Sequence, residues 1–295
     1  MSAADPTATW QSGGFNNRWV FRLSDVGCRL LPRRVLYAIS DSLMEWFQGR
    51  RPTELDAVVD NLAKAFPGKS RKETETLASA TFRSYGRGVV DYLRGGTEPP
   101  IVTPAGESEE VISSLRGGAI LVTAHMGNWE VGGAFLGGRV GPHWIVGFPE
   151  RDPEVEAFRR KKRGASGHTT LNVGMGVPGM MALRRALESG GRMVALVDRP
   201  VGKDAVRVVF RGRPANFLKS PAVFSLLTGA PLVPVSVLCE APGRYTAHVG
   251  KPFTTAECGG EPGAAMQRTA DFFSVLLERY PDQWYNFFRY WREEP

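Results

Sequence analysis

The sequence predicts an α/β protein with a mostly parallel sheet flanked by helices and with an N-terminal helical segment. From residue 119 onward, short apolar runs typical of buried strands alternate with stretches typical of helices. Residues 16–94 instead carry apolar positions at helical spacing. The chain has 295 residues, of which 42% are hydrophobic and 23% charged, so it can bury one large α/β core or two smaller ones.

The N-terminal part is predicted to be helical and basic. Apolar residues recur at helical spacing between Trp19 and Leu30, and again between Leu36 and Trp46 after a break at Pro32. Arginines interleave with the apolar positions of the first stretch and lie beside Pro32. A basic amphipathic helix of this kind suits an anionic membrane surface, although such stripes also pack on protein cores.

Two further helices are expected near residues 54–66 and 72–93, with clear stop and start signals between them. Pro67-Gly68 ends the first, and Ser70 followed by Glu73 has the spacing of a capping box. The Pro-rich stretch 95–106 is the best boundary. We therefore expect a membrane-facing helical segment over residues 1–100 and one continuous α/β catalytic core over 101–295. Strands are expected near residues 119–124, 143–148, 169–173, 193–197, 206–210 and 231–238.

The most informative short element is His125-Met126-Gly127-Asn128-Trp129-Glu130, which directly follows the apolar run 119–124. Gly and Asn close the predicted strand and open a helix, with Asn128 expected as the N-cap and Glu130 in the first turn. His125 is therefore placed at the carboxyl end of a buried strand, the edge at which open α/β sheets form their sites.

An imidazole and a carboxylate at this spacing can act together. A neutral imidazole takes a proton from an alcohol, while a nearby carboxylate fixes its tautomer and stabilises its cation. The same spacing also fits a core histidine beside an ordinary first-turn glutamate. Other parts of the sequence are needed to choose between a catalytic pair and a core histidine.

A rival motif is Gly174-Met175-Gly176-Val177-Pro178-Gly179, which matches the dinucleotide fingerprint G-x-G-x-x-G. It follows a predicted strand, and Asp198 closes the next one, as a nucleotide-dependent oxidoreductase would require. Pro178, however, falls inside the turn whose amides should face the pyrophosphate. The alternative explanation is a Gly-rich connection with Pro178 near a helix start.

Composition and missing motifs narrow the class of protein. The three cysteines are scattered, so neither a disulfide framework nor a metal site is expected. A formal net charge of +7 favours an acidic partner, and no Lys/Arg stripe or binding motif points to nucleic acid. Serine hydrolase, P-loop and zincin signatures are absent. With no secretory signal and no transmembrane helix expected, a cytoplasmic location is predicted.

Ordered blocks after the hexapeptide shift the balance toward a catalytic His125. They are a basic segment at 159–164, Asp198-Arg199-Pro200, and residues 210–215 and 229–235. With Asn61-Leu62, Ser84-Tyr85-Gly86-Arg87 and Pro281-Asp282-Gln283-Trp284, this order resembles the bacterial lipid A biosynthesis acyltransferase family, part of the wider glycerolipid acyltransferase superfamily. The resemblance covers nearly the whole chain.

The resemblance implies transfer of a fatty acyl group from a thioester of acyl carrier protein or coenzyme A to a hydroxyl of a lipid or glycolipid acceptor. His125 would be the general base, and Glu130 would orient and polarise it. The thioester is a co-substrate, so no bound cofactor is implied. The implied location is the cytoplasmic face of the bacterial inner membrane, where the basic protein would bind an anionic surface peripherally.

Substrate binding is expected to involve further residues. Backbone amides around Gly127-Asn128, or a basic side chain, could supply the donors that the oxyanion needs. Asp198 is expected to be structural or to contact the acceptor. The arginines expected to hold phosphate or other anionic groups are Arg160, Arg163 and Arg213.

The chain departs from the family pattern in three places. Residues 1–17 are polar where an apolar anchor is usual, Asp198-Arg199-Pro200 replaces Asp-Gln-Asp, and residues 284–291 lack the usual tryptophan and histidine-arginine pattern. These departures leave the acceptor open among a lipid A precursor, another glycolipid, a lysophospholipid and an aryl-polyene-type lipid.

Overall fold

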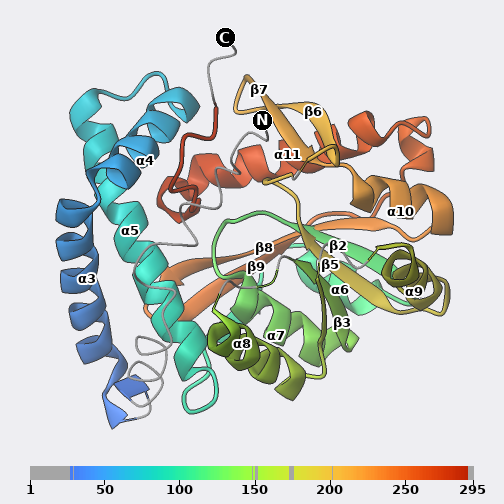
Figure 1. Ribbon diagram of the computed structural model, residues 1–295, viewed down its shortest axis with the longest axis horizontal. Coiled ribbons are helices and arrows are strands. Elements are labelled where there is room, and N and C mark those ends of the chain that lie inside the picture. Colours follow the sequence, from blue (N-terminus) through green and yellow to red (C-terminus); the bar gives the residue numbers. More distant parts are fainter. Residues whose placement is uncertain are drawn as a thin grey trace. The chain divides into compact units, whose positions relative to one another are not determined.

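The computed structural model describes residues 27–28, 30–147, 149, 152–172, 176–200 and 202–291 (Figure 1). The helix expected between Trp19 and Leu30 lies almost entirely outside these residues. The chain forms two compact units, one made of residues 1–100, 150–158 and 280–295 and the other of 101–149 and 159–279. The division at residue 100 coincides with the expected boundary. Residues 150–158 and 280–295, however, belong with the N-terminal unit, whereas the sequence placed them in the core.

The N-terminal unit is built from α3 (Arg33–Arg50), α4 (Pro52–Ala65) and α5 (Arg71–Arg94). The predicted capping box is present at the start of α5. The Ser70 hydroxyl accepts the Glu73 N–H, and the Glu73 carboxylate accepts the Ser70 N–H. These two bonds satisfy N–H groups that a helix start leaves unpaired, which explains why the helix begins here.

Helices α3 and α5 approach each other closely at Gly86. A Cβ atom at this position would lie 2.5 Å from Ser40 Oγ and 2.8 Å from Met44 Cγ. Next to it, Arg87 donates two hydrogen bonds to Asp41, from Nε at 2.9 Å and from Nη2 at 2.5 Å. The close approach at Gly86 and the hydrogen bonds from Arg87 to Asp41 therefore hold α3 against α5.

The C-terminal segment is bound to the same helices. The Asn61 amide donates to the carbonyls of Asn286 and Phe288 and accepts the Tyr290 N–H. Ser84 donates to Asp282 at 2.6 Å. These motif residues therefore share a structural role, because they hold the C-terminal segment against α4 and α5.

The second unit contains a mostly parallel sheet, as predicted, with strand order β1-β9-β8-β2-β5-β3-β4 among the described residues. Within the described part of the chain, the one antiparallel pair of this sheet is β8 with β9. The strands are β1 (Ile101–Pro104), β2 (Ala119–Thr123), β3 (His143–Gly147), β4 (Thr169–Asn172), β5 (Arg192–Leu196), β8 (Leu232–Ala241) and β9 (Arg244–Val249).

A separate antiparallel hairpin is formed by β6 (Ala205–Phe210) and β7 (Arg213–Leu218). The sequence predicted β6 as one more strand of the alternating pattern and did not predict β7, β1 or β9. β1 is short and largely exposed, while β7 opens with Arg-Pro, so neither has the continuous apolar run of a buried parallel strand.

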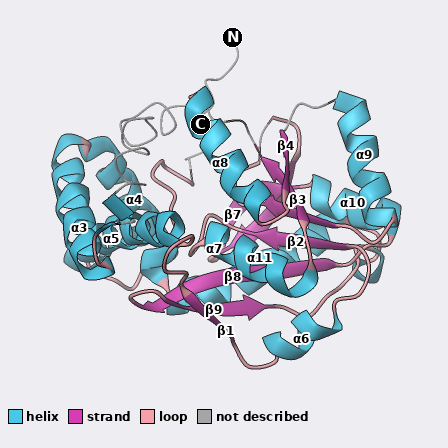
Figure 2. Cartoon of the chain, turned by 90° about the horizontal axis from the view of Figure 1, so that it is seen from below, coloured by secondary structure: helices cyan, strands magenta, loops and turns pink. Residues whose placement is uncertain are grey.

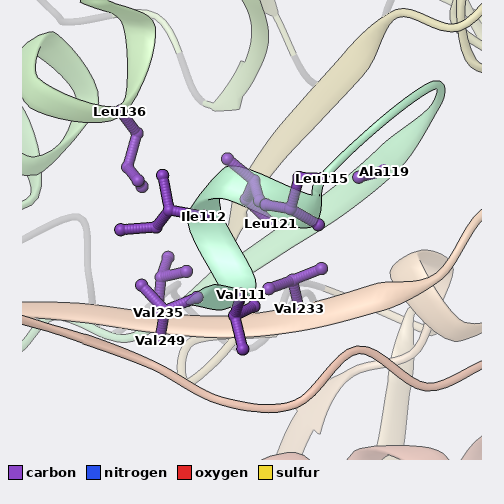
Figure 3. Close-up of a cluster of buried hydrophobic side chains, with 9 residues drawn as sticks. All are labelled: Val111, Ile112, Leu115, Ala119, Leu121, Leu136, Val233, Val235 and Val249. Carbon is purple, nitrogen blue, oxygen red and sulfur yellow. The ribbon is translucent and has the colours of Figure 1, made fainter. Parts of the chain in front are cut away.

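Helices cover both faces of the sheet (Figure 2). On one face, α6 (Ser108–Ser114) and α7 (Trp129–Val140) pack on β2, β8 and β9. The other face carries α9 (Gly176–Glu188), α10 (Ser220–Thr228) and α11 (Pro262–Arg279). α8 (Pro153–Ala165) connects β3 to β4, and short 3-10 turns span Ala256–Cys258 and Pro281–Gln283. Figure 3 shows the first of these interfaces, with Val111, Ile112, Leu115, Ala119, Leu121, Leu136, Val233, Val235 and Val249.

Within the described ranges, every helix is too short or too polar to cross a bilayer.

Candidate active site

His125 and Asp198 are brought together by strand register. β2 and β5 are parallel neighbours, with Thr123 paired to Leu196. The ladder extends one step further, because the Val197 N–H donates to the Thr123 carbonyl at 2.8 Å. His125 and Asp198 each follow their strand end by two positions, so both lie at the carboxyl edge of the sheet.

The contact between the two side chains is short and doubled. His125 Nδ1 lies 2.7 Å from Asp198 Oδ1, and the same oxygen accepts the His125 backbone N–H at 3.0 Å. The Asp198 side chain is fully buried, whereas the imidazole is 19% exposed. A carboxylate on Nδ1 favours the tautomer with a proton there, which leaves the Nε2 lone pair available. Among the described residues, Nε2 has no hydrogen-bond partner.

The surroundings keep the imidazole neutral. Burial lowers the pKa of His125 below its ordinary value, the Arg199 guanidinium lowers it further, and Asp198 offsets only part of this. Burial would raise the pKa of Asp198, but His125 and Arg199 together hold it well below its usual range. The pair at neutral pH is therefore an uncharged base beside an ionised carboxylate.

Glu130 has a different partner from the one expected. Its carboxylate accepts two hydrogen bonds from Arg163 on α8, from Nη2 at 2.5 Å and from Nε at 3.1 Å. Burial favours protonated Glu130, yet Arg163 outweighs it and lowers the carboxyl pKa. The carboxylate within hydrogen-bond distance of His125 is Asp198, for which the sequence suggested only a structural or acceptor-binding role. The signal that points to Asp198 is a polar residue two positions after each of two neighbouring strands.

The turn between His125 and α7 is fixed against β8. Gly127 has a φ of +64°, and a Cβ there would lie 2.2 Å from the Val237 carbonyl oxygen. That oxygen accepts the Asn128 N–H at 2.8 Å. The Asn128 side chain accepts the Val131 N–H, so it is the predicted N-cap of α7. Since its amide is already bonded, Asn128 does not present this N–H to an oxyanion as expected.

The other predicted residues lie on other elements. Arg160 is exposed on α8, and Arg213 is exposed at the start of β7. Of the fingerprint at residues 174–179, Gly174 lies outside the described residues and Pro178 falls in the first turn of α9. Asp198, which that fingerprint would need for a ribose, is bound to His125 instead.

The sequence of the chain is similar to those of known proteins. A model of the bacterial lipid A biosynthesis acyltransferase family matches residues 17–293. The chain belongs to this family. It is 28% identical to a phosphatidylinositol mannoside acyltransferase of Mycolicibacterium smegmatis over 238 residues, covering 76% of this chain and 75% of the relative. It is 25% identical to the protein of that name from Mycobacterium tuberculosis over 283 residues, covering 90% and 86%.

Among solved structures, the chain is similar to the 1-acyl-sn-glycerophosphate acyltransferase PlsC from Thermotoga maritima, with a TM-score of 0.44 and 14% identity over 86% of this chain and 100% of that one. Membership in the lipid A acyltransferase family makes the protein an enzyme, an acyltransferase that acts on a lipid or glycolipid.

The glycine of the turn provides a test of this site. We expect Gly127→Ala to destabilise the protein by about 2–4 kcal/mol and to remove most activity, because the added methyl meets a backbone oxygen in a left-handed conformation. The matched control is Gly138→Ala, because Gly138 is an exposed residue of α7 and the added Cβ atom would have no atom within 4 Å. Urea unfolding and acyl transfer should both separate the variants; equal behaviour would show that the turn does not depend on this approach.

Proposed function

We propose that this acyltransferase moves a fatty acyl group from a thioester, carried by acyl carrier protein or coenzyme A, to a hydroxyl of a lipid acceptor, with His125 as general base. The observation that carries the proposal is the 2.7 Å contact between His125 Nδ1 and Asp198. It supplies a neutral imidazole in a fixed tautomer, with Nε2 available for the proton of the acceptor hydroxyl.

In the first step, Nε2 takes the hydroxyl proton while the acceptor oxygen attacks the thioester carbonyl carbon, giving a tetrahedral oxyanion and an imidazolium. Asp198 stabilises that cation without taking its proton. In the second step, the carbon–sulfur bond breaks, the carbonyl re-forms, and the imidazolium returns its proton to the leaving thiolate. The products are an ester and a free thiol, and no covalent acyl-enzyme is needed.

The oxyanion requires hydrogen-bond donors beside the imidazole. Of the two amides expected from the sequence, Asn128 already donates to Val237, so we assign this task to Gly127.

The second carboxylate has a positioning role in this proposal. Glu130 holds Arg163 by two hydrogen bonds, so the guanidinium presents a fixed face to a substrate anion. Arg160 and Arg213 are exposed cations that would meet phosphate of the donor or acceptor. Loss of Glu130 should therefore affect substrate binding rather than the basicity of His125.

The acceptor and the setting are inferred more broadly. Both named relatives are phosphatidylinositol mannoside acyltransferases, which favours a mannosylated phospholipid over a lipid A precursor. A formal charge of +7 favours an acidic carrier protein as donor and an anionic cytoplasmic membrane face as the place of action. The protein would bind the surface of the bilayer and would not need a membrane-spanning helix.

The reaction is tested by incubating purified protein with acyl carrier thioester or acyl coenzyme A, each with an isotope-labelled acyl chain, and with a total lipid extract. Mass spectrometry should find the label in an ester of a glycolipid. His125→Ala should lower the rate by about 10²- to 10⁴-fold in a protein that stays folded, with a lower thermal stability because buried Asp198 loses one of its two donors. Full activity of this variant would refute the general-base mechanism, and NAD or NADP reduction without acyl transfer would favour the oxidoreductase alternative.

The pH profile separates the two carboxylates. Because the His125 pKa is lowered, kcat/KM should rise with pH through a midpoint below about 6.5. Asp198→Asn removes the charge that raises this pKa, so the midpoint should move to still lower pH and the plateau should fall at least about tenfold. Glu130→Gln is the matched control and should raise KM while leaving the midpoint unchanged. A midpoint that moves with Glu130→Gln and stays with Asp198→Asn would assign the pairing to Glu130.

A further inference from the structure

Helix α7 begins with an aromatic residue that contacts the imidazole of His125. The centroids of the Trp129 and His125 rings are 5.4 Å apart, and the ring planes are inclined at 68°, which is a T-shaped contact. Aromatic pairs with this distance and inclination attract each other. The two reaction steps described above involve His125 and Asp198 and leave Trp129 without a role.

The place of Trp129 is set by bonds that do not involve His125. Trp129 is the first residue of α7 and follows the N-cap Asn128. The Asn128 N–H donates to the Val237 carbonyl at 2.8 Å, and the Asn128 side chain accepts the Val131 N–H at 3.2 Å. Because these bonds hold the backbone on both sides of Trp129, its ring can limit how far the imidazole moves.

Asp198 restrains the imidazole through a single ring atom. Its carboxylate lies 2.7 Å from Nδ1, while the torsion that rotates a histidine ring about its Cβ–Cγ bond has broad minima. A general base must direct its lone pair at the acceptor proton within about 10–20°. The Trp129 ring packs on the imidazole as well, so the two contacts together restrain Nε2 more closely than either does.

Trp129 also limits the contact of the imidazole with water. The Asp198 side chain is fully buried, whereas the His125 side chain is 19% exposed and so lies at the boundary between protein and solvent. Burial is the largest cause of the lowered His125 pKa. An indole ring against the imidazole covers part of its surface, and loss of that ring would expose the imidazole further.

Water at this place would compete with the acceptor hydroxyl. If Nε2 took a proton from water, the water oxygen would attack the thioester carbonyl carbon. The carbon–sulfur bond would then break, and the imidazolium would give its proton to the leaving thiolate. The products would be a fatty acid and a thiol, so the acyl group would be lost to hydrolysis instead of forming an ester.

We propose that Trp129 is a positioning residue that holds the His125 ring in the orientation set by Asp198 and keeps water from Nε2, so that a lipid hydroxyl receives the acyl group. This inference rests on the proposed function, because it takes His125 as the base. The charged groups that shift the pKa of His125 are Asp198 and Arg199, which both follow β5. Trp129 carries no charge, so it acts through contact and through the exclusion of solvent.

Trp129→Ala tests the inference, with Phe135→Ala as the matched control. Phe135 is a partly buried aromatic residue of the same helix, and it packs on apolar clusters that include residues of the sheet. The labelled thioester that the wild type accepts is supplied with the lipid extract, and labelled ester and labelled fatty acid are measured together.

Trp129→Ala should lower kcat for ester formation at least about tenfold, with KM for the thioester within about twofold of wild type. The ratio of fatty acid to ester should rise at least about fivefold, because water reaches the base. Trp129→Phe keeps an aromatic ring and should recover kcat to within about threefold of wild type. Phe135→Ala should leave the ratio unchanged.

Nitrogen-15 NMR of the histidine-labelled protein gives a readout that does not depend on turnover. Water that replaces the Trp129 ring would weaken the burial that lowers the His125 pKa, so the titration midpoint of His125 should rise toward about 6.5 in Trp129→Ala. Asp198→Asn is expected to lower the same midpoint, and Phe135→Ala should leave it unchanged.

Trp129→Ala that loses thermal stability like Phe135→Ala, but keeps the wild-type midpoint and the wild-type ratio, would overturn the inference. So would a raised KM at unchanged kcat, because Trp129 would then be a substrate contact. Trp129→Leu, which keeps apolar volume at the start of α7, undergoes the same measurements if Trp129→Ala does not fold. A fully active His125→Ala would refute the proposed function instead, whereas an unchanged His125 midpoint in Trp129→Ala refutes the role of Trp129 alone.

Discussion

The site depends on the pairing of β2 with β5. Because Thr123 lies opposite Leu196, the residues two positions beyond these strand ends meet at the sheet edge, and a buried carboxylate reaches His125 Nδ1. Asp198 is stable as a buried anion since two donors of His125 share its oxygen. A shift of the register by one residue would turn one of the two side chains to the other face of the sheet and separate His125 from Asp198.

The turn after His125 connects the end of β2 to the start of α7. Gly127 lets the chain pass within contact of Val237, and Asn128 then starts α7 with its backbone amide and its side chain both bonded. Helix α7 presents Glu130 to Arg163 of α8. One short segment therefore contains His125, the close turn and a carboxylate that binds Arg163, while the partner of His125 follows β5, 73 residues later in the chain.

Local features were predictable because their causes lie within a few residues. The capping box at Ser70, the N-cap at Asn128 and the place of His125 at a strand end follow from short-range rules, and the structure confirms each. Asp198 as the partner of His125 depends on the strand order β2-β5-β3, which no local pattern encodes. The hairpins β6-β7 and β8-β9 are local instead, because two-residue turns close them, with Phe210 paired to Arg213 and Ala241 to Arg244.

We expect Asp198 to hold His125 as a neutral imidazole with its proton on Nδ1. The chain has four histidines, so nitrogen-15 NMR of the histidine-labelled protein can follow each ring, with His125 assigned by its loss in His125→Ala. At pH 7 the spectrum should show a protonated Nδ1 and a bare Nε2, with a titration midpoint below about 6.5. A proton on Nε2, or an imidazolium at pH 7, would contradict this expectation.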